Sequence, residues 1–116
     1  EAGKFDEGIK ALQASQGSGG ASSFGSSLEA LIASGYADSK KYDEAAKHYL
    51  SAAEKASFPS ERDLHRADAA RVLTVAGKND EARKIWADIA SRLDSPAIGE
   101  AKIRLGELTA SGSPKK

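Results

Sequence analysis

The sequence contains neither cysteine nor methionine among its 116 residues, and both absences restrict its chemistry. The lack of cysteine excludes disulfides, thiolate metal ligands and a thiol nucleophile. No apolar run approaches the roughly 18 residues that a membrane-spanning helix needs, and no charged-then-apolar signal segment follows Glu1. We therefore expect no membrane contact by this stretch of chain. Because the first residue is Glu1 and methionine is absent throughout, we also expect the chain to be a processed product or an excised piece of a longer protein.

Excess charge of either sign is absent as well. Seventeen basic residues balance seventeen acidic ones, so no overall field attracts nucleic acid or an anionic membrane. The basic residues alternate with acids, so the basic stripe of a nucleic-acid-binding repeat protein is missing. We expect no nucleic-acid partner, and we expect local features to select any partner.

Motifs for catalysis and cofactor binding are lacking. The histidines His48 and His65 have no second histidine or cysteine at metal-ligand spacing. The glycine-rich segment Gly17–Gly20 follows a predicted helix rather than a strand, so it is interpreted as a flexible connection and not a phosphate loop. We predict no enzyme activity, no catalytic or metal-binding residues and no cofactor.

An internal repeat is the main feature that is present. The motif Gly3–Gly8 returns as Lys40–Ala45 and as Gly77–Ala82, with a spacing of 37 residues both times. Each copy holds Asp-Glu at the same position, and acidic residues in a first turn suit the positive end of a helix. A fixed period of this length predicts a stacked helical-repeat protein.

Apolar residues follow each motif at helical spacing. The clearest stripe predicts one buried helix face and is formed by Ala82, Ile85, Trp86, Ile89, Ala90 and Leu93. Similar patterns lie between the motifs, and no stretch has the pattern of a strand, so the sequence predicts an all-α fold of about six paired helices. Helix starts are predicted at Ser60, with Asp63 completing a capping box, and at Ser95 followed by Pro96.

These signals divide the chain into six segments. The expected organisation is the second helix of a truncated repeat over 1–15, a flexible loop over 16–23, helical hairpins over 24–57 and 60–94, a half-repeat or capping helix over 96–111, and a tail over 112–116.

The residues at fixed places in the hairpins resemble the tetratricopeptide-repeat (TPR) family. The first copy matches the family pattern of packing residues at Ala33, Tyr36, Tyr42, Ala45, Tyr49 and Ala52, and the second at Ala70, Leu73, Gly77, Ala82, Trp86 and Ile89. The first copy departs from the pattern at Lys40, where the family favours glycine. The second departs at Asn79, where the family favours an aromatic residue, and at Ile89, where it favours alanine. The resemblance implies a right-handed solenoid of two full repeats flanked by two half-repeats, which binds other proteins and is not catalytic.

The resemblance also implies a binding groove. In this family the first helix of each pair lines a concave surface that takes an extended peptide or a partner helix. The residues at those positions are Ser27, Ala30, Ser34, Leu64, Ala67, Arg71, Thr74, Ile103 and Glu107. Arg71 is the one expected to anchor an acidic group, although a surface ion pair with Asp68 or Asp94 is the favoured interpretation. The asparagine and lysine set with which some members clamp a chaperone tail is absent.

The run from Ser95 to Leu108 is similar to the bacterial YfgM-like group of the family, whose members carry an amino-terminal membrane anchor. That likeness implies a protein-binding scaffold in the cell envelope, facing the periplasm. The alternative is a cytoplasmic adaptor, or a regulatory or oligomerisation module of a larger protein. Half-repeats at both ends would expose apolar faces, so we also expect self-association. Either Phe5, Ile9 and Leu12 dock on another copy, or this segment swaps between copies across the Gly17–Gly20 connection.

Overall fold

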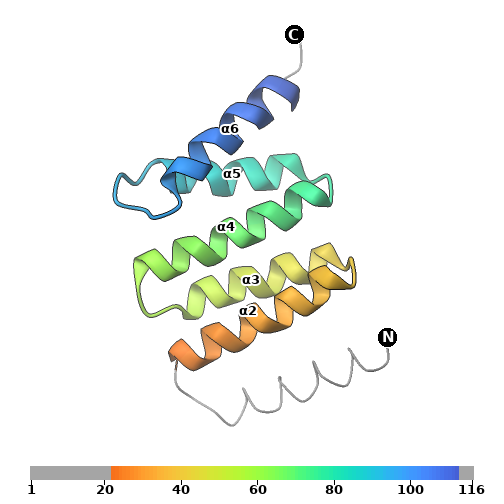
Figure 1. The fold of residues 1–116 in the computed structure, drawn as a ribbon, viewed down its shortest axis with the longest axis vertical. Helices are drawn as coiled ribbons and strands as arrows, with labels where there is room; N and C mark the ends of the chain where they lie inside the picture. The colour runs from red at the N-terminus through yellow and green to blue at the C-terminus, as the bar shows by residue number, and fades with distance from the viewer. Residues whose placement is uncertain (1–21, 113–116) are drawn as a thin grey trace.

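The computed structural model describes residues 22–112, which form an all-α structure (Figure 1). Its helices are α2 (Ser22–Asp38), α3 (Tyr42–Lys55), α4 (Pro59–Val75), α5 (Asn79–Ala90) and α6 (Ile98–Gly112). This part of the chain contains no strand, which agrees with the prediction. The expected helix over 1–15, most of the expected loop over 16–23 and nearly all of the expected tail lie outside the described residues.

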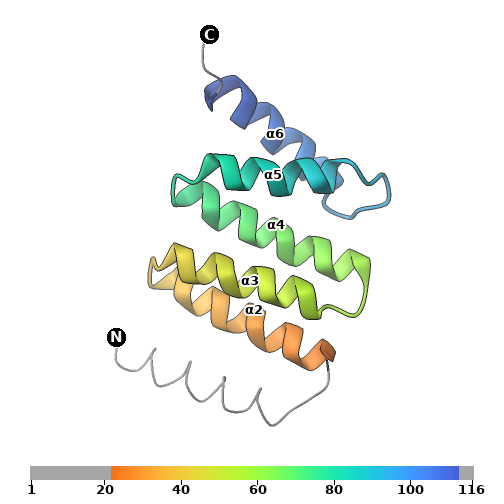
Figure 2. The same ribbon diagram turned by 180° about the vertical axis from the view of Figure 1, so that it is seen from behind.

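The helices form a stack in which each one packs against its neighbours in sequence. The extensive helix contacts are those of α2 with α3, α3 with α4, α4 with α5 and α5 with α6. Successive helices alternate in direction, and α2 and α6 lie at opposite ends of the described stack (Figures 1 and 2). The arrangement is therefore a series of helical hairpins whose contacts are mostly local in sequence.

The two complete hairpins keep the period of the sequence motif. Helix α4 starts 37 residues after α2 (Ser22 to Pro59), and α5 starts 37 residues after α3 (Tyr42 to Asn79). Helix α6 begins at Ile98, which is 39 residues after Pro59. The second inter-hairpin connection is therefore longer than the first.

Both hairpins turn through the same backbone conformation. Lys40 has φ 64° and Gly77 has φ 84°, and these are the two described residues with positive φ. At the first turn the backbone N–H of Lys41 donates to the carbonyl of Tyr36 over 2.9 Å, and the equivalent bond 37 residues later has the same length. A hydrogen bond of this kind, from an N–H to the carbonyl five residues earlier, satisfies one of the last carbonyls of the helix. It requires the residue before the donor to adopt the left-handed backbone region, which glycine does without strain.

The start of α4 differs from the prediction. The predicted capping box of Ser60 and Asp63 is wrong, because α4 begins at Pro59 after Phe58 and has no side-chain cap. Proline has no N–H to satisfy and its fixed φ suits the first helical position, so the helix can begin one residue earlier. Asp63 is released from a capping role and is buried instead.

The end of α5 and the start of α6 also differ from the prediction. Helix α5 ends at Ala90, so Leu93 is not part of its buried stripe and is 86% exposed. Pro96 lies in a turn rather than in the first helical position, and the Ser95 hydroxyl accepts a hydrogen bond of 3.2 Å from the N–H of Ala97. These contacts form a structured connection between α5 and α6.

The core is continuous from α3 to α6 and is built mainly from alanine and a few large residues. Its buried members are Ala46, Ala67, Ala70, Leu73, Ala82, Trp86, Ile89, Ala97, Ala101 and Leu108. The small side chains let helix axes approach closely, while Trp86 is the largest fully buried residue.

Most of the residues that were matched to the repeat packing pattern are buried. Those buried in the structure are Ala33, Ala45, Ala52, Ala70, Leu73, Ala82, Trp86 and Ile89. Tyr36, Tyr42 and Tyr49 are half-buried, whereas Gly77 is exposed in the turn after α4. The pattern therefore marks buried helix faces and one turn.

Candidate functional site

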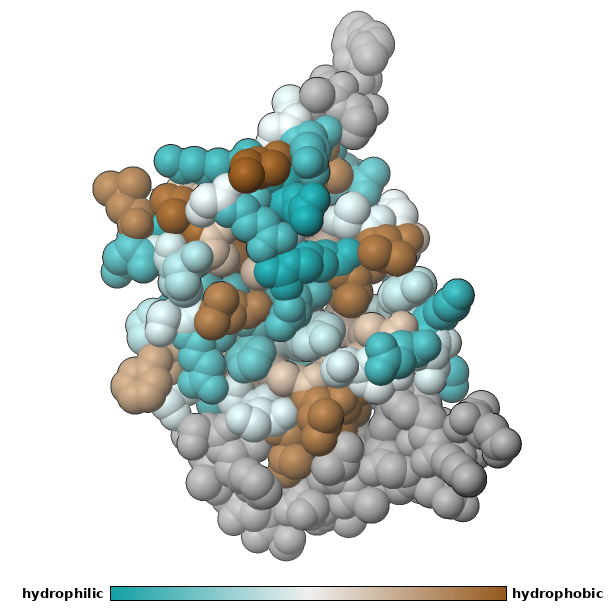
Figure 3. Space-filling view, viewed as in Figure 1, coloured by the Kyte–Doolittle hydropathy of each residue, from teal (hydrophilic) through white to brown (hydrophobic). Residues whose placement is uncertain are grey.

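The predicted groove residues lie on α2, α4 and α6, the first helices of the successive hairpins. Figure 3 shows the face on which α2 and α6 lie nearest the viewer, where apolar side chains are separated by polar ones. Ser27, Leu64, Thr74, Ile103 and Glu107 are exposed. We call the surface formed by the exposed residues of α2, α4 and α6 the first-helix face.

The other four predicted groove residues are less accessible. Ala30 and Arg71 are half-buried, and so is Ser34, whose hydroxyl is hydrogen-bonded to Tyr49. Ala67 is 0% exposed and belongs to the core. Its assignment to the groove lining is therefore wrong, because a methyl group that is enclosed by neighbouring helices cannot contact a partner.

Three predicted groove residues meet at one cavity. Arg71, Thr74 and Glu107 line a pocket of about 310 Å³ between α4, α5 and α6. The lining is completed by Val75, Trp86, Arg104 and Leu108. We call this cavity the α4–α6 pocket, and Ser27, Leu64 and Ile103 lie outside it.

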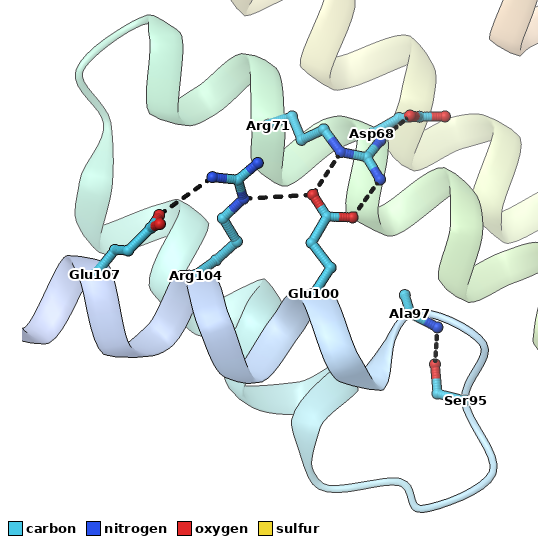
Figure 4. Close-up of polar contacts among 7 residues, drawn as sticks. All are labelled: Asp68, Arg71, Ser95, Ala97, Glu100, Arg104 and Glu107. Carbon is cyan, nitrogen blue, oxygen red and sulfur yellow. Dashed lines mark hydrogen bonds and ion pairs between the residues drawn. The ribbon is translucent and has the colours of Figure 1, made fainter.

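Arg71 is held by carboxylates from two helices (Figure 4). Its Nη2 donates to Oε1 of Glu100 over 2.6 Å and its Nε donates to Oε2 over 2.9 Å, and Arg71 also pairs with Asp68. The expected ion pair with Asp68 is confirmed, whereas the alternative with Asp94 is wrong. The missed partner is Glu100, which lies 29 residues away in sequence.

Arg104 extends this network along α6. Its Nη1 donates to Glu107 over 3.1 Å and its Nε lies 3.4 Å from Glu100 (Figure 4). The side chains of Arg104 and Glu107 are 44% and 59% exposed, so solvent screens this pair strongly. The α6 half of the network is therefore easier to rearrange than the Arg71–Glu100 pair.

Protonation of the carboxylates depends on their partners. The hydrogen bonds from Arg71 lower the pKa of Glu100, with burial acting in the opposite direction. Burial raises the pKa of Asp68 despite the nearby Arg71 guanidinium. Hydrogen bonding to Glu100 raises the pKa of Arg71, so the bridge between α4 and α6 is a charged pair at neutral pH.

Trp86 carries a buried polar atom next to the core. The side chain is 0% exposed, and its Nε1 has no hydrogen-bond partner among the described residues. An unpaired buried donor costs about 1–3 kcal/mol. The sequence marked Trp86 only as a packing residue, because periodicity gives no information on the bonding of a side-chain atom.

A second ion-pair cluster joins α4 to the connection after α5. Arg92 donates to the two carboxylate oxygens of Asp63 over 2.5 and 3.2 Å, and the Asp63 side chain is 3% exposed. Burial opposes ionisation of Asp63, but hydrogen bonds from Arg92 and Ser95 outweigh it and lower the pKa of this carboxyl. This cluster fastens the connection to α4.

The two histidines take part in separate structural contacts. His48 Nδ1 lies 2.7 Å from Glu29, whose other oxygen accepts a hydrogen bond from Lys55, and the His48 ring stacks on Tyr36 with centroids 5.3 Å apart. His65 lies 4.0 Å from Glu61. Within residues 22–112 no group of three or more histidine, aspartate and glutamate side chains is placed to hold a metal ion.

Comparisons of the chain with family models, with curated proteins and with solved structures find no match. In the part of the chain that the structure describes, no helix combines the length and the apolar character needed to cross a bilayer.

Proposed function

We propose that this chain is a non-catalytic TPR-type helical-repeat module that binds other proteins on its first-helix face. Support comes from the repeated hairpin, whose two copies share a 37-residue period and the same turn at Lys40 and Gly77. Helices that contact mainly their sequence neighbours are characteristic of solenoid repeats, which commonly bind partners along an extended surface.

The observation that carries the proposal is the series of exposed aliphatic side chains on the first helices. Leu31 of α2 is 56% exposed, Leu64 of α4 is 48% exposed and Ile103 of α6 is 62% exposed. Exposed aliphatics from three first helices, together with the Arg71 ion-pair network, give an apolar surface with polar surroundings. Such a surface suits an extended peptide segment that carries spaced apolar residues.

The expected partner is a protein segment of no strong net charge, because Arg71 and Arg104 already pair with carboxylates of α6. The likeness to the YfgM-like group favours a scaffold in the cell envelope. A cytoplasmic adaptor or oligomerisation module is the alternative. A second copy of the chain is also a candidate partner.

Photo-crosslinking tests the proposal. A photoreactive phenylalanine analogue placed at Leu64 or Ile103 should crosslink a discrete partner in extracts. The same analogue at Leu50 of α3, which is 36% exposed, is the control for the other helix set. Separate envelope and cytosolic extracts show which compartment supplies the partner. Equal crosslinking from Leu50 and Leu64 would contradict binding on the first-helix face.

A matched pair of substitutions measures how much an exposed leucine of the first-helix face contributes to partner binding. Leu64→Asp should weaken binding of the crosslinked partner by at least about tenfold, because a charge would replace an apolar contact. Leu50→Asp should leave the affinity within about twofold, since it changes charge and hydropathy equally on another helix. Circular dichroism of both variants verifies that the helices are retained.

A further inference from the structure

The two connections between hairpins lie side by side at one end of the helices (Figures 1 and 2). The first joins α3 to α4 and contains Phe58, and the second joins α5 to α6 and contains Leu93. These two side chains are the most exposed large apolar ones of the described residues, at 66% and 86%. Neither belongs to the aliphatic series on which the proposed function depends.

A cavity of about 540 Å³ lies between the two connections and is lined by both of them. Phe58, Pro59 and Arg62 contribute to the lining from the first connection and the start of α4. Arg92, Asp94 and Pro96 contribute to it from the second connection. We call the surface formed by these six residues and Leu93 the connection edge.

The connection edge carries one arginine and one aspartate without partners. Arg62 is the one arginine of the described residues that forms no ion pair, and the Asp94 side chain forms neither an ion pair nor a hydrogen bond within them. The carboxylate of Asp63 is already held by Arg92, which donates to both of its oxygens. One positive and one negative group are therefore left beside exposed apolar side chains.

A second copy of the chain has the complementary arrangement of charges. Around a two-fold axis a surface meets itself, so each contact between two different residues occurs twice. Arg62 of one copy can then face Asp94 of the other, and the reverse pair forms across the axis. Phe58 and Leu93 lose contact with water at the same time, which favours association. A partner with a single charge would leave one of the two groups unpaired.

We propose that two copies of this chain associate around a two-fold axis through the connection edge, with Arg62 of each copy paired to Asp94 of the other. Phe58 and Leu93 supply the apolar part of the contact. The edge is small, so the dissociation constant is expected to be about 10–100 µM, which is typical of weak interfaces. The inference goes beyond the proposed function, because it concerns a different surface of the stack.

Sedimentation equilibrium of the full 116-residue chain tests the association. The parent should show a monomer–dimer equilibrium at concentrations up to about 500 µM, and a strictly monomeric parent over this range would overturn the inference. Phe58→Ser should weaken dimerisation at least about tenfold. Val75→Ser is the control, because Val75 is 64% exposed but lies at the other end of α4, and it should change the affinity less than about twofold. Equal effects of the two substitutions would also overturn the inference.

Charge reversal tests the pairing itself. Arg62→Glu and Asp94→Arg should each be monomeric at these concentrations, because each change brings like charges together on both sides of the axis. An equimolar mixture of the two variants should dimerise again, since every contact in the mixed dimer joins opposite charges. Circular dichroism of each variant verifies that the helices are retained. A single variant that dimerises as the parent does, or a mixture that stays monomeric, would overturn the inference.

Discussion

Arg71 of α4 and Glu100 of α6 are joined by two hydrogen bonds, of 2.6 and 2.9 Å, across helices that are not neighbours in sequence. The extensive contacts of α6 are with α5, so this bidentate pair adds a direct link between α6 and α4. It lies beside the α4–α6 pocket and fixes the orientation of the Arg71 guanidinium. Fork-shaped pairs of this kind are more directional than single ion pairs.

Removal of this link should loosen α6 selectively. Glu100→Gln should destabilise the α6 contact by about 1 kcal/mol, a value reduced for the partial exposure of both side chains. Hydrogen exchange of α6 amides should then be about fivefold faster, while exchange in α2 and α3 stays unchanged. Glu107→Gln is the control, since that carboxylate is 59% exposed. Uniform acceleration across all helices would show that the pair has no local role.

The Asp63–Arg92 pair should contribute more to stability than any exposed pair. Asp63→Ala should lower the free energy of unfolding by about 2 kcal/mol, because it removes charged hydrogen bonds at a buried position. Asp80→Ala removes a carboxylate that is 89% exposed and should change stability by less than about 0.5 kcal/mol. Urea unfolding followed by circular dichroism measures both values, and equal effects would contradict the assigned role of Asp63.

Acid should weaken the fold through Asp63 and Glu100. Both carboxyls have a lowered pKa in the folded protein, relative to ordinary values of 3.8 and 4.5. As the pH falls below these values, the unfolded chain takes up protons first, so the stability contributed by each group is lost through its folded pKa. Asp68 acts in the opposite direction, because its raised pKa favours folding at low pH.

The measurement is the urea midpoint between neutral pH and about pH 3, for the parent and Asp63→Asn. The stability difference between them should be largest near neutral pH and should shrink as the pH falls below the ordinary value of 3.8. A difference that stayed constant over this range would show that ionisation of Asp63 does not contribute.

Introducing glycine at position 40 and removing it at position 77 should change the stability of the fold in opposite directions. Lys40→Gly should raise stability by about 0.5–1 kcal/mol, because Lys40 occupies the left-handed region at φ 64°. Gly77→Ala should lower stability by about 1 kcal/mol for the same backbone reason, since no atom lies within 4 Å of the added methyl group. Thermal unfolding of the two variants tests the pair. A loss of stability in Lys40→Gly would mean that the lysine side chain makes a contribution greater than the strain.

The sequence by itself determined the helices, their pairing and the turns between the members of each pair. These features are local: periodic apolar residues define one helix face, and acidic residues fit the first turns of α3 and α5. The 37-residue spacing also placed the two hairpin turns in the same register. The apolar and acidic patterns lie within one helix, and the 37-residue spacing is found by comparing one stretch of the sequence with the next, so neither requires knowledge of the packed structure.

The tertiary structure alone decided which groups meet across the stack. Asp63 looked like a helix-capping residue but is buried against Arg92, and Ala67 looked like a groove residue but lies in the core. Glu100 reaches Arg71 only because the connection after α5 has the length and turns that place α6 beside α4. The α4–α6 pocket is therefore a product of packing, because side chains from three helices must meet before it exists.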